Sequence, residues 1–131
     1  LSSAAGVASA EGMARIYAAA LTGLEGESAL PPLLTEETIR TVSAEQVFGI
    51  DRVFGETGCF ATVFMKSHAR MPFGSYRAFG HDGASASLGF ADPVYELGFG
   101  SVPQRAEPGG VGCRNFQLSS AVREVIAGFA A

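Results

Sequence analysis

The stretch that decides the fold is Arg77-Ala78-Phe79-Gly80-His81-Asp82-Gly83-Ala84-Ser85-Ala86-Ser87-Leu88-Gly89-Phe90-Ala91-Asp92-Pro93. A short apolar run ends in Gly-His-Asp-Gly, small residues follow, and a second apolar run ends at Asp-Pro. Apolar runs that stop at Gly, Asp or Pro are typical of strands joined by turns. We therefore expect a strand over 76–79 that leads into the motif, then a hairpin of strands 86–91 and 95–102.

The second strand of this hairpin has two unlike faces. Tyr95, Leu97 and Phe99 point one way, whereas Gly98 and Gly100 point the other. Glycine on one face of a strand indicates that another backbone comes close. We expect the C-terminal helix to pack there with a single apolar stripe, made of Leu118, Val122, Val125, Ile126 and Phe129.

The N-terminal part predicts two helices. The first has an apolar stripe at helical spacing, a cap at Ser9 and a stop at Gly23; the stripe consists of Met13, Ile16, Tyr17, Ala20, Leu21 and Leu24. Thr35 caps a short second helix that runs toward Val42. Residues 47–58, interrupted by Gly49 and Gly55, are expected to be irregular and to lie on the surface, and residues 60–65 to form one strand buried on both faces.

These expectations give the order helix, small helix, three or four antiparallel strands, helix, which is an α+β fold. The length of 131 residues suits one domain. Only 17% of the residues are charged and 47% are hydrophobic, a balance that favours a chain whose faces meet further protein. The net charge of −4 argues against a nucleic-acid partner, and no apolar run is long enough for a membrane span.

The remaining chemistry-bearing residues indicate little by themselves. Cys59 and Cys113 are expected to be free thiols, with Cys59 a small buried apolar residue. His68 beside Arg70 is interpreted as a solvated loop residue. His81 and Asp82 lack a third ligand at suitable spacing, so we predict no metal and no cofactor.

Gly80-His81-Asp82-Gly83, with its surrounding strands and the helix at each end, resembles the third active-site motif of the penicillin-recognising serine hydrolases. Class C β-lactamases usually have Lys-Thr-Gly there, and related esterases have His-x-Gly or Trp-x-Gly. The resemblance runs from about residue 4 to residue 131. The family's Ser-x-x-Lys motif is missing, because the one lysine, Lys66, follows Val63 by three residues. The family's Tyr-x-Asn motif is missing as well.

This resemblance implies that residues 1–131 are a single partial domain, the C-terminal portion of a class C β-lactamase-like hydrolase whose serine lies upstream. It assigns one oxyanion donor to the backbone N–H of Ala84 and a substrate-binding wall to His81, Gly83, Ala84 and Ser85. Histidine is mostly neutral at pH 7, so His81 in place of lysine favours an uncharged ester over a β-lactam carboxylate. The implied reaction is hydrolysis of a small ester or amide through an acyl-serine, with no activity in this chain alone.

The resemblance also implies a partner. The outer edge of strand 95–102 would be bare, and bare apolar edges recruit other chains. We expect it to be covered by the N-terminal part of the same protein or by a second copy. Three alternatives stay open: a non-catalytic binding or structural module with this fold, an unrelated α+β protein, and an ordinary turn with an exposed histidine at 81.

Overall fold

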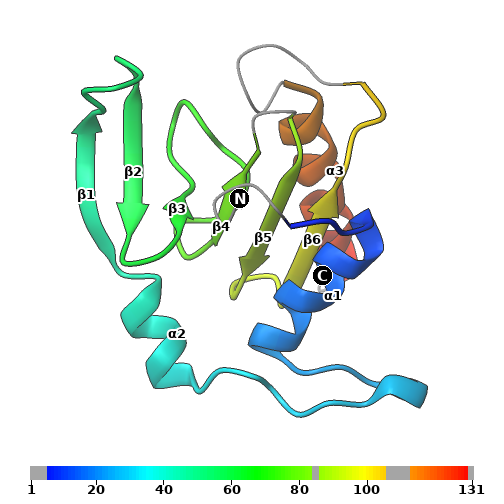
Figure 1. Cartoon of the computed structure of the whole chain (residues 1–131). Helices are drawn as coiled ribbons and strands as arrows, with labels where there is room; N and C mark the ends of the chain where they lie inside the picture. The colour runs from blue at the N-terminus through cyan, green and yellow to red at the C-terminus, as the bar shows by residue number, and fades with distance from the viewer. Residues whose placement is uncertain (1–5, 84–85, 106–112, 130–131) are drawn as a thin grey trace.

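In the computed structural model the described residues are 6–83, 86–105 and 113–129. The elements are α1 (Ala10–Leu21), a 3-10 turn η1 (Gly26–Ser28), α2 (Glu36–Val42), β1 (Glu45–Ile50), β2 (Thr57–Ala61), β3 (Met65–Lys66), β4 (Phe79–Asp82), β5 (Leu88–Asp92), β6 (Leu97–Ser101) and α3 (Cys113–Phe129). The strands form one six-stranded antiparallel sheet in the order of the sequence (Figure 1). The α+β class is confirmed, with more strands than expected.

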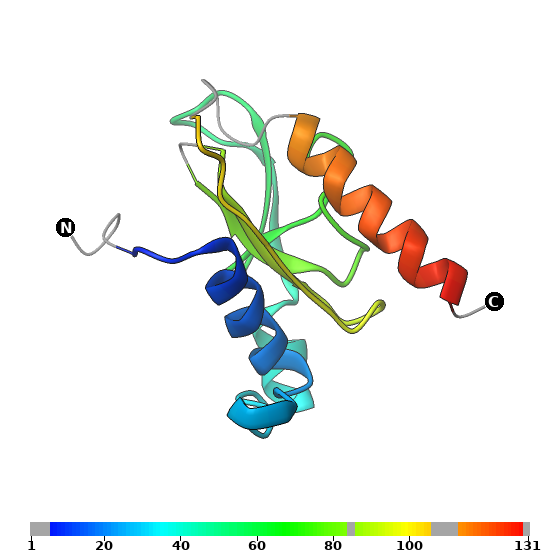
Figure 2. The same ribbon diagram turned by 90° about the vertical axis from the view of Figure 1, so that its right-hand side faces the viewer.

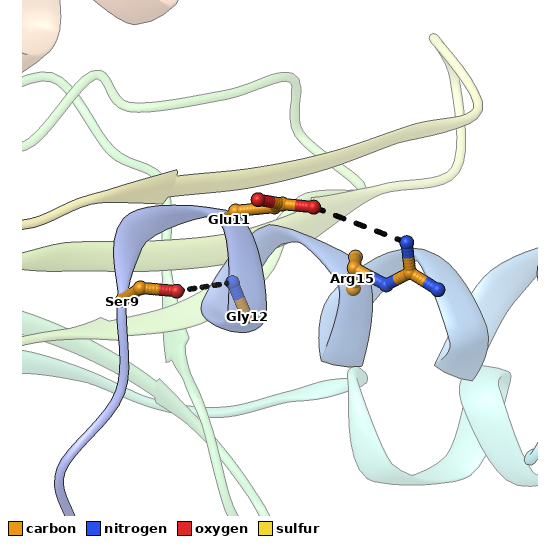
Figure 3. A network of polar contacts seen from close by, with 4 residues as sticks. All are labelled: Ser9, Glu11, Gly12 and Arg15. Atoms are coloured by element: carbon orange, nitrogen blue, oxygen red, sulfur yellow. Dashed lines mark hydrogen bonds and ion pairs between the residues drawn. The ribbon is translucent and has the colours of Figure 1, made fainter. Parts of the chain in front are cut away.

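Both N-terminal helices begin at the predicted caps. The hydroxyl of Ser9 accepts a hydrogen bond from the N–H of Gly12 at 3.0 Å (Figure 3), and the hydroxyl of Thr35 does the same for Thr38. Figure 3 also shows the ion pair of Glu11 with Arg15, which lies on the surface and stabilises α1 only slightly. No helix of the described ranges is long and apolar enough to cross a membrane.

The prediction that residues 47–58 are irregular is wrong, because they belong largely to a hairpin. β1 pairs with β2 from Glu45 opposite Ala61 to Ile50 opposite Thr57. The carboxylate of Asp51 closes the connection by accepting the N–H groups of Val53 and Phe54 at 2.7 and 2.9 Å. A Cβ added at Gly49 would meet nothing within 4 Å, so this glycine does not interrupt the strand.

Residues 60–65 do not form one strand, as predicted, but the end of β2 and the start of β3. The N–H of Ala61 donates to the carbonyl of Phe64 at 2.7 Å, and Phe60 pairs with Met65. The chain thus reverses within the apolar run, where no Gly or Pro marks the turn. β4 likewise begins at Phe79 and includes the first three residues of the motif, Gly80 to Asp82, whereas the predicted strand stopped at Phe79.

The predicted hairpin of β5 and β6 is confirmed, but the helix on its glycine face is α1, not α3. A side chain at Gly98 would run into the backbone of Ala14 and Ala18, and one at Gly100 into that of Ala10. The small residues on one side of α1 allow this close approach. Figure 2 shows α1 and α3 on opposite sides of the sheet.

α3 therefore packs on the aromatic face of the sheet. Its Phe116 and Val122 contact the buried cluster that contains Phe90 and Phe99. The predicted stripe is largely turned outward, since Leu118, Val125 and Phe129 are 48%, 58% and 87% exposed. α3 instead buries Asn115 and Ser119, two polar residues that a search for apolar periodicity passes over.

Candidate functional site

The Gly-His-Asp-Gly motif lies at the end of β4. Phe79 and Gly80 are buried, whereas His81 is exposed. β3 pairs only with Phe79 and Gly80, so no strand of the described part lies beside His81 and Asp82 on that side. On the other side, β5 pairs with all four residues of β4. On one side, therefore, His81 and Asp82 have no neighbouring strand among the described residues, and we call this place the open step in the sheet.

The ring of His81 is 61% exposed and is oriented by its own chain. Its Nδ1 bonds to the carbonyl oxygen of Asp82, and the Asp82 carboxylate lies 3.7 Å from the same nitrogen. A carbonyl oxygen can only accept, so Nδ1 carries the proton. In the neutral ring, Nε2 is then an acceptor facing away from this bond. Among the described residues, none bonds to Nε2.

The chain after the motif folds back at once. The N–H of Gly83 donates to the carbonyl of Ser87 at 2.8 Å, and the N–H of Ala86 donates to the carbonyl of Gly83 at 2.9 Å. A side chain at Gly83 would meet the hydroxyl of Ser87, which would have to rotate away to make room for it. The predicted site residues Ala84 and Ser85 lie outside the described residues.

An apolar groove of about 680 Å³ separates α1 from the motif strand, and its lining includes Met13, Ile16, Tyr17, Phe64, Phe79 and Ser87. His81 follows Phe79 by two residues on β4, and its partner Gly89 lies under Met13 and Tyr17. The groove thus runs beside the motif. Burial raises the pKa of Tyr17. The stripe predicted for α1 is real: Tyr17 and Leu21 pack against the buried cluster that contains Phe79, and part of the stripe also lines this groove.

Two residues, one in β3 and one just after it, are more buried than the sequence indicated. Lys66 pairs with Phe79 and is only 5% exposed, and burial lowers its pKa despite the nearby Cys59, Asp92 and Glu45. His68 is not a solvated loop residue as predicted. Its Nε2 is buried without a partner in the described structure, and burial, then Arg70, lowers its pKa. Lys66 lies close to a turn that the sequence did not reveal, whereas His68 lies in the predicted loop but is more buried there than expected.

The cysteines are free thiols, as predicted. Cys59 is 2% exposed and its Sγ donates to a Glu45 carboxylate oxygen at 3.3 Å. Burial and this carboxylate raise the pKa of Cys59 to about 11. A thiol held in its protonated form is a poor nucleophile, which confirms its interpretation as a buried structural residue.

Comparison with solved structures shows which proteins this chain is similar to. It is 95% identical to EstA from Arthrobacter nitroguajacolicus Rue61a, with a TM-score of 0.95 over 100% of this chain and 35% of that one. Over its whole length the chain is therefore similar to one part of a β-lactamase-like esterase. A penicillin-binding protein homologue from Caulobacter crescentus is 26% identical over 88% of this chain and 32% of its own, with a TM-score of 0.74.

A third solved structure has a similar fold. A family VIII carboxylesterase, 24% identical over 86% of this chain and 31% of its own, has a TM-score of 0.69. The chain therefore spans about a third of the length of each of these proteins. No family model and no curated protein matches the sequence.

Proposed function

We propose that the chain is the C-terminal segment of a serine carboxylesterase that hydrolyses a small ester or amide. The observation that carries this is the 95% identity with EstA over the whole chain, together with the open position of the motif at the end of β4. The segment covers 35% of that protein, which leaves room for a nucleophile in the rest. Taken alone, these residues are expected to be inactive.

In the proposed reaction a serine outside the segment attacks the carbonyl carbon, and its proton passes to a neighbouring base and then to the leaving alcohol or amine. Water hydrolyses the resulting acyl-serine to the acid and restores the hydroxyl. The oxyanion of each tetrahedral intermediate would accept a hydrogen bond from the N–H of Ala84. Gly83 admits the substrate, and Ser85 completes the wall.

His81 is assigned the side of the pocket nearest the open step. Its Nδ1–H is occupied by the Asp82 carbonyl, so the neutral ring offers Nε2 as an acceptor. A neutral ring gives no fixed cation for the carboxylate of a β-lactam. This favours esters over penicillins and cephalosporins.

The nucleophile can be located directly. We would treat the full-length protein with an aryl fluorophosphonate and map the adduct by mass spectrometry. The adduct is expected on a serine outside these 131 residues, and the isolated segment should stay unlabelled. A labelled serine within the segment would overturn the proposed division of the site.

Substrate preference is the second test. The full-length protein should cleave a short-chain aryl ester and leave a chromogenic cephalosporin essentially intact. His81→Ala should lower ester turnover, whereas Tyr76→Phe, at an 82% exposed position away from the motif, should not. Strong cephalosporin turnover would contradict the assignment of His81, and absence of all hydrolysis would favour the non-catalytic binding module.

The proposed partner covers β6, which is a terminal strand of the sheet. An unpaired strand edge offers N–H and C=O groups to another chain. We propose that the remainder of the same protein, or a second copy, pairs there. The isolated segment should self-associate in analytical ultracentrifugation; a stable, monodisperse monomer would contradict this proposal.

A further inference from the structure

A buried asparagine connects α3 to the chain that follows the motif. Asn115 lies in the first turn of α3 and is 1% exposed. Its side-chain Nδ2 donates to the carbonyl of Ala86 at 2.5 Å, and its Oδ1 accepts the hydroxyl of Ser101 at 2.7 Å. The bond to Ala86 fixes which end of the amide carries the NH2 group, because a carbonyl oxygen can only accept a hydrogen bond. One side chain thus joins α3, the end of β6 and the segment before β5.

Ala86 needs such a partner. It is fully buried and has a φ of +67°, a left-handed conformation that is costly for a residue with a Cβ. Without Asn115, the carbonyl that it bonds would be a buried acceptor with no donor. Asn115 therefore stabilises both the strained backbone and the direction of this carbonyl.

The restraint continues toward the motif. The N–H of Ala86 donates to Gly83, and the N–H of Gly83 donates to Ser87. The two chain positions on either side of residues 84 and 85 are therefore bonded to one another, and Asn115 holds the second of them. We propose that Asn115 is a positioning residue for the motif, which holds the backbone of Ala86, and through it that of Gly83, in place without touching substrate. This inference rests on the function proposed above.

The kinetic test uses the full-length protein and an aryl ester. Asn115→Asp keeps the acceptor for Ser101 but loses the donor to Ala86. We expect kcat to fall about tenfold or more with KM little changed, since a misplaced oxyanion donor affects the transition state most. Ser101→Ala should lower kcat less, and Ser101→Thr, which retains the hydroxyl, should restore it. Unchanged kcat in Asn115→Asp would overturn the proposal.

The matched control is Ser119→Ala. Ser119 is also fully buried on α3, one turn further along, but among the described residues its hydroxyl bonds only to the Phe116 carbonyl of the same helix. This variant should lose some stability and keep its kcat. An equal loss of kcat in Ser119→Ala and Asn115→Asp would mean that α3 acts only through stability, which contradicts a positioning role.

A second measurement does not depend on activity. Hydrogen exchange followed by mass spectrometry should show faster exchange of the amides at Gly83 and Ala86 in Asn115→Asp, and no change there in Ser119→Ala. Equal protection in the wild type and Asn115→Asp would refute the positioning role even if the wild type were inactive. An inactive wild type with the expected exchange would refute only the proposed function.

Discussion

The carboxylate of Asp92 accepts hydrogen bonds from both the backbone N–H and the hydroxyl of Ser75, at 2.7 and 2.6 Å. Asp92 is fully buried at the end of β5, and it also accepts the N–H of Val94 at 3.1 Å. It thus joins the turn after β5 to the loop before β4. We expect Asp92→Ala to lower the free energy of unfolding by about 3 kcal/mol, because several buried donors lose a charged acceptor.

Two milder variants separate the contributions at this site in urea unfolding. Ser75→Ala removes one donor and should cost about 1 kcal/mol. Asp92→Asn keeps the shape but turns one NH2 toward a donor, so its stability should lie between those of the wild type and Asp92→Ala. If Asp92→Ala unfolded at the same urea concentration as the wild type, the hydrogen bonds of Asp92 would make no net contribution to stability.

The glycine face of β6 gives a prediction about packing. Gly98→Ala should destabilise the chain by about 1–3 kcal/mol or more, because the new methyl group meets the α1 backbone at Ala14 and Ala18. Gly49→Ala in β1 is the matched control, since its methyl group meets nothing within 4 Å. Thermal unfolding of both variants would test this, and equal midpoints would show that α1 is not seated on this face.

The two thiols should differ sharply in reactivity. Cys59 is buried with a pKa of about 11, so only about one thousandth of it is thiolate at pH 8, whereas Cys113 is exposed. A maleimide at pH 8 should modify Cys113 in the folded chain and reach Cys59 only after denaturation. Peptide mapping would show this, with Cys113→Ser as the control that removes the fast reaction. Modification of both cysteines at one rate would contradict the burial of Cys59.

His68 should make stability depend on pH. Burial lowers the pKa of its imidazole in the folded state, so the unfolded chain binds the proton more readily. The contribution of His68 to stability is complete above the pKa of the unfolded state, about 6.5. It is lost as the pH falls toward and through the lower pKa of the folded state. Urea midpoints should therefore decrease from pH 7.5 to pH 5.5.

His68→Gln should flatten this dependence, whereas His81→Gln should retain it. The chosen window lies above the range in which ordinary carboxylates titrate. A wild-type slope that survives in His68→Gln would assign the effect to another group.

The sequence predicted what local chemistry controls. Ser9 and Thr35 cap helices because their hydroxyls meet the first free N–H groups, and Asp92-Pro93 closes a hairpin. The motif could be found because its glycines and small residues stand next to apolar strands. The family resemblance followed from that order of elements.

Tertiary contacts explain what was missed. The reversal between Phe60 and Met65 carries no turn residue, so an apolar run concealed two strands. The choice of helix for the glycine face depended on the small alanines of α1, not on the larger stripe of α3. Asn115 was overlooked because its importance comes from Ala86 and Ser101, which are distant in sequence.

The shortness of β3 has a consequence for how the site could evolve. With only two residues, β3 begins at Met65 opposite Gly80, so its pairing ends before His81 and Asp82. The extent of this pairing is a property of the backbone, which a point substitution changes less readily than a change in length. Lengthening β3 by a residue or two would carry it past His81 and Asp82 and extend the pairing along β4. Insertions and deletions at the turn before β3 are thus the changes that would lengthen or shorten this strand pairing.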